Sequence, residues 1–255
     1  MNYERPYYID MGLKPLIIYL VFGVDDPQPE FSQEKYGSVQ LPEGLNILPV
    51  DKEGMEELRD ELLSGIYADV LREYSGDFFD KVRNSTGWVM ISGEVQKDDS
   101  LTYFRDIAGI IQAYLDKGAI GVLDLQIIRL YTALDWKNKV FEGLFNPMEQ
   151  VLLMASPLNG AIWIHSRGFR KFGRPDIGIE NVPEDEVETA AEVAEQMTRY
   201  SAQGAVFADG SVFCISGGRR YSVKLKFVPD FTNDDYNNAY YHINWAECVL
   251  RSDND

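Results

Sequence analysis

The sequence is poor in the residues that build disulfide scaffolds and metal sites. Among its 255 residues there are two cysteines and two histidines. Disulfide-stapled domains use many more cysteines in much shorter chains. A zinc site or a Ser-His-Asp triad would have to use His165 or His242, which lie in separate segments. We therefore expect free thiols in a reducing, cytoplasmic compartment, no metal and no other cofactor.

The common catalytic loops and a membrane-spanning segment are also missing. The chain has no Walker A loop, no G-x-G-x-x-G after a strand, no G-x-S-x-G elbow, and no C-x-x-C or H-E-x-x-H pair. Its longest apolar run, residues 16–24, is far shorter than the ~20 residues that a membrane helix needs. The first residues lack the basic start and apolar core of a signal peptide. These absences favour a protein that has no catalytic activity and does not bind a membrane. An enzyme remains the alternative.

Basic residues are scarce relative to acidic ones. The chain has 24 Lys and Arg against 41 Asp and Glu, so its formal net charge is −17. A field of this sign repels nucleic acid and anionic lipid. It favours solubility and would steer a basic partner towards the surface. We therefore expect a basic protein as partner, with no nucleic acid and no membrane; composition leaves the oligomeric state open.

Strand and helix patterns are both present, which is typical of an α+β protein. Helical spacing covers residues 52–82, 100–118 and 183–204, and places Met55, Leu58, Leu62 and Ile66 on one apolar stripe. Residues 25–49 are rich in proline and glycine and predict a long surface connection. Asp209-Gly210 is the strongest hairpin signal. Strands are predicted over residues 15–23, 88–95, 151–155, 161–165 and 221–228. We predict a mixed, mainly antiparallel sheet with helices packed on one side.

The domain organisation has two interpretations. The chain is either a single α+β domain over residues 1–255, or two similar strand–helix–strand halves over about 1–145 and 146–250. The second interpretation rests on an internal echo, in which a strand and a helix are followed by Tyr114-x-x-x-Gly118 and again by Tyr200-x-x-x-Gly204. Glycine is common after any helix, so the echo alone does not decide between them. Residues 251–255 predict a polar tail.

The most unusual segment is His165–Asp176, which places four cations within eight residues of an acidic chain. Arginines hold carboxylates or phosphates through paired hydrogen bonds, so this loop is a candidate anion clamp. The competing interpretation is that its cations pair with carboxylates of the protein and tie the loop to the body. Phe169 and Phe172 are expected to anchor the loop in the core. The candidates for an anion or partner site are His165, Arg167, Arg170, Lys171, Arg174 and Asp176, together with a second cationic spot at Arg219 and Arg220.

The segment Arg167–Asp176, the acidic helix after it, Tyr200-x-x-x-Gly204 and Asp209-Gly210 together resemble an uncharacterised bacterial domain family of unknown function. The signature is Arg-Gly, an aromatic residue, Arg-Lys-Phe-Gly, a variable residue, proline and an acid, followed by an acidic helix and a DG hairpin. Residues 88–139 resemble the segment that often precedes this pattern, so the resemblance covers about half of the chain. Arg174 stands where the family usually has an apolar residue, and the region around Cys214 departs from its usual hairpin exit. The resemblance implies a related fold and brings no activity, cofactor or catalytic residue.

Two functions are consistent with these patterns. The first is a non-catalytic binding or accessory protein, in its sharpest form an immunity-like protein that neutralises a basic partner. The alternative is an enzyme acting on an anionic small molecule held by the Arg167–Arg174 loop. A flat, acidic surface with an apolar centre would favour the first, and a concave pocket around that loop would favour the second.

Overall fold

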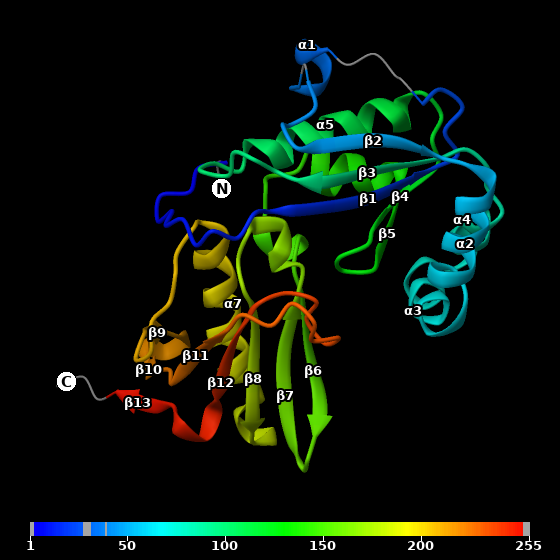
Figure 1. Cartoon of the computed structure of the whole chain (residues 1–255). Coiled ribbons are helices and arrows are strands. Elements are labelled where there is room, and N and C mark those ends of the chain that lie inside the picture. Colours follow the sequence, from blue (N-terminus) through cyan, green and yellow to red (C-terminus); the bar gives the residue numbers. More distant parts are fainter. Residues whose placement is uncertain (1–2, 28–31, 39, 252–255) are drawn as a thin grey trace. The chain divides into compact units, whose positions relative to one another are not determined.

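The chain divides into two units, and the division is not a single cut. The first unit comprises residues 1–4 and 16–145, and the second comprises residues 5–15 and 146–255. The structure, a computed structural model, describes residues 3–27, 32–38 and 40–251 (Figure 1). Residues 5–15 therefore belong to the second unit although they precede the first strand in the chain.

The first unit is built on a five-stranded antiparallel sheet of order β2-β3-β1-β4-β5. Its strands are β1 (Leu16–Phe22), β2 (Leu45–Val50), β3 (Trp88–Glu94), β4 (Gly121–Asp124) and β5 (Arg129–Thr132). Its helices are α1 (Gln33–Tyr36), α2 (Lys52–Leu62), α3 (Gly65–Ser75), α4 (Asp77–Arg83), α5 (Thr102–Asp116) and α6 (Ala133–Trp136), followed by a π-helical turn, η1 (Lys137–Phe141).

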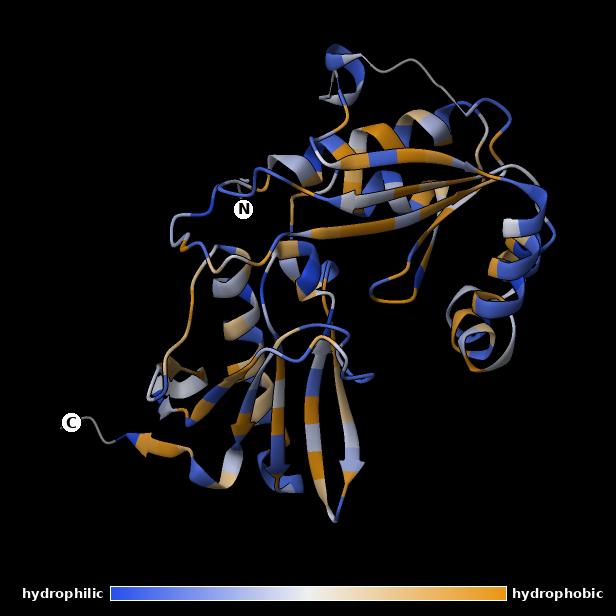
Figure 2. Ribbon diagram, in the orientation of Figure 1, coloured by the Kyte–Doolittle hydropathy of each residue, from blue (hydrophilic) through white to orange (hydrophobic). Residues whose placement is uncertain are grey.

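Strand β1 lies at the centre of this sheet because its apolar run can be buried on both faces (Figure 2). Successive side chains of a strand point to opposite faces. Leu20 and Phe22 therefore join the cluster formed with α2–α4, whereas the ring of Tyr19 meets that of Trp136 edge-on, with centroids 5.6 Å apart. Helix α5 lies along one face of the sheet, and most of its residues are buried (Figure 1).

The helical pattern predicted for residues 52–82 corresponds to three separate helices, α2, α3 and α4. The structure has a break at Ser75–Gly76, where α3 ends and α4 begins. It also has one at Leu63–Ser64, so that α2 and α3 are separate helices. Because α3 starts anew, Ile66 does not continue the stripe and is 81% exposed. The prediction that Ile66 shares one apolar stripe with Met55, Leu58 and Leu62 is therefore wrong.

The second unit has one mixed sheet of order β11-β12-β8-β7-β6 and a small antiparallel sheet of order β13-β10-β9. Helix α7 (Val187–Ala202) contacts β7 and β8 and buries Ala194 and Met197. The strands are β6 (Leu152–Leu158), β7 (Ala161–Arg167), β8 (Asp176–Val182), β9 (Val212–Cys214), β10 (Arg220–Ser222), β11 (Leu225–Val228), β12 (Tyr240–Asn244) and β13 (Val249–Arg251). Short 3-10 turns are η2 (Pro147–Glu149), η3 (Phe169–Phe172), η4 (Glu184–Glu186), η5 (Ser216–Gly218) and η6 (Trp245–Glu247).

Asp209-Gly210 forms a turn, but the strands predicted on either side of it do not pair as a hairpin. Gly210 has a φ of 81° and the amide of Ser211 donates to the carbonyl of Ala208 at 3.0 Å, so a turn is present. However, residues 205–208 form no strand, and β9 pairs with β10 instead. The two-residue hairpin is at Asn159-Gly160, between β6 and β7, where φ is 52° and 82° as a type I′ turn requires.

The α+β class with mainly antiparallel sheets is confirmed, but the strands form three sheets where the sequence predicted one.

Several single elements differ from the prediction. Residues 25–49, predicted as a surface connection, contain most of β2, and the pattern at 221–228 divides into β10 and β11 of different sheets. Strands β8 and β12, which pair in parallel, were not predicted. In the predicted internal repeat, a helix is followed by a glycine in both units. Strand β4 begins soon after Gly118, whereas residues 205–208 after Gly204 form no strand. Of the predicted tail, Arg251 ends β13 and residues 252–255 lie outside the described part.

Candidate functional site

The cationic loop, residues 167–176, connects β7 to β8 in the second unit and is rigidly held. Gly168 and Gly173 flank the turn η3 with φ of 108° and 58°. A Cβ at Gly173 would lie 2.4 Å from the carbonyl oxygen of Leu13, so only glycine fits there. Phe169 and Phe172 are fully buried, which confirms them as core anchors. The backbone of the loop is thus set by packing and gives its cations fixed directions.

Two of these cations hold a neighbouring loop. Arg167 donates to the carbonyl oxygens of Asp235 at 3.0 Å and Asp234 at 2.6 Å. Arg170 donates to the carbonyl oxygen of Asn237 at 3.2 Å. Backbone oxygens, and not the carboxylates expected from the sequence, are therefore the internal acceptors of these two side chains.

The other two cations are buried. Arg174 is 1% exposed and donates to the carbonyl oxygens of Ile9 and Gly204, both at 2.8 Å. Lys171 is fully buried, with its Nζ 3.5 Å from Oε1 of Gln150. These two cations thus point into the protein interior and hold segments of the second unit together.

Asp176 is fully buried at the start of β8. Its Oδ1 accepts from Oγ of Ser166 at 2.7 Å, and its Oδ2 accepts from Nδ2 of Asn238 at 2.7 Å. Burial raises the pKa of Asp176 to about 7, and the hydrogen bonds from Asn238 and Ser166 oppose that rise. The carboxyl group therefore links three segments of the core and lies away from solvent.

His165 is buried on β7 beside a serine. Its ring stacks on Trp163 with centroids 3.7 Å apart, and its Nε2 lies 3.4 Å from Oγ of Ser156 on β6. Burial lowers the pKa of His165, so the ring is neutral near pH 7. Within the described part of the chain, Nδ1 of His165 has no hydrogen-bond partner. A Ser-His pair without a group that orients the imidazole lacks the third member of a triad.

Arg219 and Arg220 lie at the small sheet and are exposed. Nε of Arg219 donates to the carbonyl oxygen of Ser216 at 3.4 Å, and Arg220 pairs across the sheet with Cys214 and Arg251. These contacts are separate from those of Arg167 to Arg174. Arg167, Arg170 and Arg219 therefore donate to different carbonyl oxygens.

The described residues contain neither a metal-binding cluster nor a membrane-spanning helix. No three His, Cys, Asp or Glu side chains among them come together as a metal-binding group. No helix in that part of the chain combines the length and apolarity needed to cross a membrane.

An exposed apolar surface on α3 was missed by the sequence reasoning. Ile66 and Tyr74 are 81% and 84% exposed, and Tyr67 and Val70 beside them are also exposed. We call these four residues the α3 face. Ala68 and Leu71 of the same helix are buried instead. The signal that could have revealed this surface is Ser64-Gly65, which ends one helical pattern and begins another.

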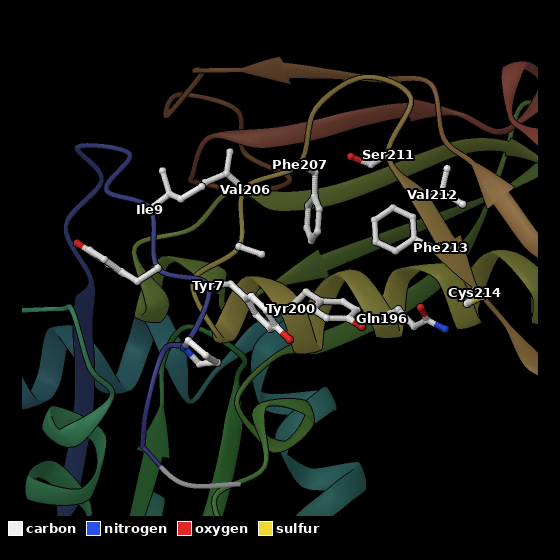
Figure 3. A pocket seen from close by; sticks show the side chains of 13 residues that line it. Tyr7, Ile9, Gln196, Tyr200, Val206, Phe207, Ser211, Val212, Phe213 and Cys214 are labelled. Atoms are coloured by element: carbon white, nitrogen blue, oxygen red, sulfur yellow. The ribbon is translucent and has the colours of Figure 1, made fainter.

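A hollow in the second unit was also missed. Its volume is about 690 Å³, and aromatic side chains from distant parts of the sequence line it. Figure 3 shows Tyr200 and Gln196 on α7, Tyr7 beside Tyr200, and Phe207 and Phe213 on the chain that follows the helix. No local pattern in the sequence marks this hollow, because its walls come together only in the folded chain.

Comparison of the chain with protein-family models, with curated proteins and with solved structures finds no match. The resemblance of the Arg167–Asp176 segment to an uncharacterised bacterial family therefore stays a prediction. The candidate sites depend on the geometry described above.

Proposed function

We propose that this chain is a non-catalytic binding protein that recognises a basic protein through the α3 face. The observation that carries the proposal is the exposure of Ile66 and Tyr74, which are large apolar side chains on one side of a helix. Exposed apolar patches rimmed by polar residues mark interaction surfaces. Tyrosine is among the residues that contribute most binding energy in such surfaces.

The charge around this face supports a basic partner. The first unit has 12 Lys and Arg against 24 Asp and Glu, a net charge of −12, whereas the second has 12 against 17, a net charge of −5. Asp69 and Glu73 lie on α3 next to the apolar residues. Within the described part of the chain, Glu73 forms no ion pair, and Asp69 has only Arg72 at 3.8 Å. A basic surface with an apolar centre would complement both features.

Two basic side chains of α2–α4, Arg59 and Arg72, are also engaged with aromatic rings of the first unit. Arg59 donates to the carbonyl oxygen of Arg83 and lies over the ring of Trp88. Arg72 lies over the ring of Phe79, 4.6 Å from its centroid. Both guanidinium groups thus contact neighbouring elements of the first unit, and Arg72 also lies 3.8 Å from Asp69 and from Asp80.

An immunity-like role is the sharper form of this proposal, in which binding neutralises the basic partner. We place the protein in the reducing cytoplasm because Cys214 and Cys248 are both free thiols. The alternative, an enzyme that holds an anionic molecule between Arg167 and Arg174, has less support, because these arginines already donate to backbone carbonyls.

The test is affinity capture from the native host at low ionic strength with matched variants. The α3 variant carries Ile66→Ala and Tyr74→Ala, and the control carries Leu134→Ala and Leu144→Ala, which are 67% and 85% exposed outside α3. A basic protein should be retained by the parent and the control. Its affinity for the α3 variant should be lower by about 30-fold or more, as expected for the loss of a central aromatic anchor.

Two outcomes would overturn the proposal. One is that no basic protein is retained by the folded parent at low salt. The other is that the captured protein binds the α3 variant as tightly as it binds the control. A captured protein that is acidic or neutral would remove the electrostatic part of the argument.

A further inference from the structure

The hollow of the second unit has walls that differ chemically from the rest of the protein. Of the 13 residues that line it, none is charged, although 65 of the 255 residues of the chain are Asp, Glu, Lys or Arg. Its volume of about 690 Å³ falls within the range of small-molecule sites. Tyr7 and Tyr200, at its wall, are 50% and 42% exposed. The hollow is thus an open, neutral and aromatic cavity.

The aromatic walls are held in place by contacts behind them. The rings of Phe207 and Phe213 meet edge-to-face with centroids 5.2 Å apart. The hydroxyl of Tyr241 accepts a hydrogen bond from the amide of Phe207 at 3.3 Å. The rings of Tyr7 and Tyr200 lie 5.7 Å apart (Figure 3). Ring faces fixed in this way accept flat aromatic molecules by offset or edge-on stacking.

Residues 6–9, which form one wall, are tied by hydrogen bonds to the end of α7. The amides of Tyr7 and Ile9 donate to the carbonyl oxygens of Gln203 and Gly204, both at 3.1 Å. Arg174 donates to the carbonyl oxygens of Ile9 and Gly204. Arg174, a candidate ligand-binding residue from the sequence, is therefore a positioning residue for this wall.

One polar side chain of the hollow has an unused hydrogen-bonding group. Gln196 is half-buried on α7, and within the described residues its amide has no hydrogen-bond partner. Ser211, by contrast, already bonds the backbone of Ala208 through its Oγ. A primary amide offers both donors and an acceptor, so Gln196 can pair with another amide and orient a bound molecule.

From these features we infer that the hollow binds an uncharged, planar aromatic small molecule bearing an amide-like group that pairs with Gln196. The ring system lies among Tyr7, Tyr200, Phe207 and Phe213. An anion finds no cation in the lining, and it is repelled by a chain of net charge −17. A cation finds no carboxylate in the lining.

The test uses naphthalene-2-carboxamide as the probe and titrates it into the full chain by calorimetry. We expect saturable binding to one site with a dissociation constant of about 0.1–1 mM, which is reasonable for a ligand of this size. Naphthalene-2-carboxylate has the same shape and a negative charge, and it should bind at least about tenfold more weakly because the hollow supplies no cation.

Matched variants locate the probe. Gln196→Ala and Tyr200→Ala should each weaken binding by about fivefold to tenfold, through loss of an amide pair or of a ring contact. Leu134→Ala removes an exposed apolar side chain of the first unit and should leave binding unchanged. Unchanged melting temperatures would show that the variants remain folded.

Alkylation of Cys214 supplies a second measurement, because its exposed thiol lines the hollow whereas Cys248 does not. The amide probe should slow the reaction of Cys214 with iodoacetamide and leave that of Cys248 unchanged.

The inference is overturned if the amide shows no saturable binding, if it binds Tyr200→Ala as well as the parent, or if the carboxylate binds equally. It is also overturned if sedimentation shows dimers that Tyr200→Ala dissociates, since the hollow would then be an interface between copies.

Discussion

The guanidinium group of Arg174 donates to the carbonyl oxygen of Gly204 at 2.8 Å, across 30 positions of the sequence. A second hydrogen bond from the same nitrogen reaches the carbonyl oxygen of Ile9 at 2.8 Å. Through these two bonds, a residue of the cationic loop joins the chain after α7 to residues 5–15. The contact shows how backbone carbonyl groups hold an almost fully buried arginine in place.

Arg174→Ala should therefore destabilise the protein by about 3 kcal/mol, because it leaves buried carbonyl groups without a donor. The matched control is Arg220→Ala, which removes an exposed arginine from the small sheet. That control should change stability by no more than about 0.5 kcal/mol. Urea unfolding measures both, and equal midpoints for the two variants would contradict the role given to Arg174.

Gly204→Ala should be more damaging than Gly210→Ala, although both glycines have positive φ, 95° and 81°. An added Cβ at Gly204 would lie 2.5 Å from Cα of Tyr8, whereas nothing lies within 4 Å of one at Gly210. We expect a loss of about 1 kcal/mol for Gly210→Ala from backbone strain alone. Gly204→Ala should lose at least about twice as much, because the segment carrying Tyr8 must move. Thermal unfolding of the two variants tests the difference, and the reverse order would refute it.

Asp176 should make stability depend on pH in the direction opposite to a salt-bridged carboxylate. Its folded pKa is raised from 3.8 to about 7, so between these values the folded state binds more protons than the unfolded state. The stability contributed by this group is then fully present below pH 3.8 and is lost as pH rises towards 7. Its loss is bounded by about 4 kcal/mol, the free energy of three pKa units.

The check is to compare the parent with Asp176→Asn, since other carboxylates also titrate in this range. Asparagine stays neutral, so the substitution should be more destabilising at pH 5 than at pH 8. Denaturant unfolding at the two pH values gives the difference directly. A gap between parent and variant that is constant with pH would show that Asp176 does not titrate in this window.

The partner of the α3 face should associate at a rate that depends strongly on salt. Raising the ionic strength from about 0.05 M to 0.5 M should slow association about tenfold, because screening shortens the reach of the acidic field. Replacing Asp69 with Asn and Glu73 with Gln should lower the association rate, whereas Ile66→Ala and Tyr74→Ala should raise the dissociation rate. Stopped-flow or surface-based kinetics separates the two effects. Association insensitive to salt would exclude electrostatic steering.

Local patterns in the sequence determined several parts of this structure. The apolar run of β1, the strands β6 and β7, and the helix α7 that ends before Gly204 could all be predicted from local residue patterns. Propensity and period act over a few residues, so they indicate where a helix or strand forms. The burial of Phe169 and Phe172 was predictable for the same reason, since two large apolar side chains in a short loop favour an interior position.

Only the tertiary structure decided what the candidate residues do. Charge density in the sequence indicated that Arg174 was special, but not that it would bind the carbonyl groups of Ile9 and Gly204. A break at Leu63–Ser64 turned Ile66 out to solvent and created the α3 face. The hollow joins residues 6–9 to residues 196–214, whose proximity no local period encodes. Which surfaces meet is set by packing over the whole unit, and the chemistry of a site follows from that packing.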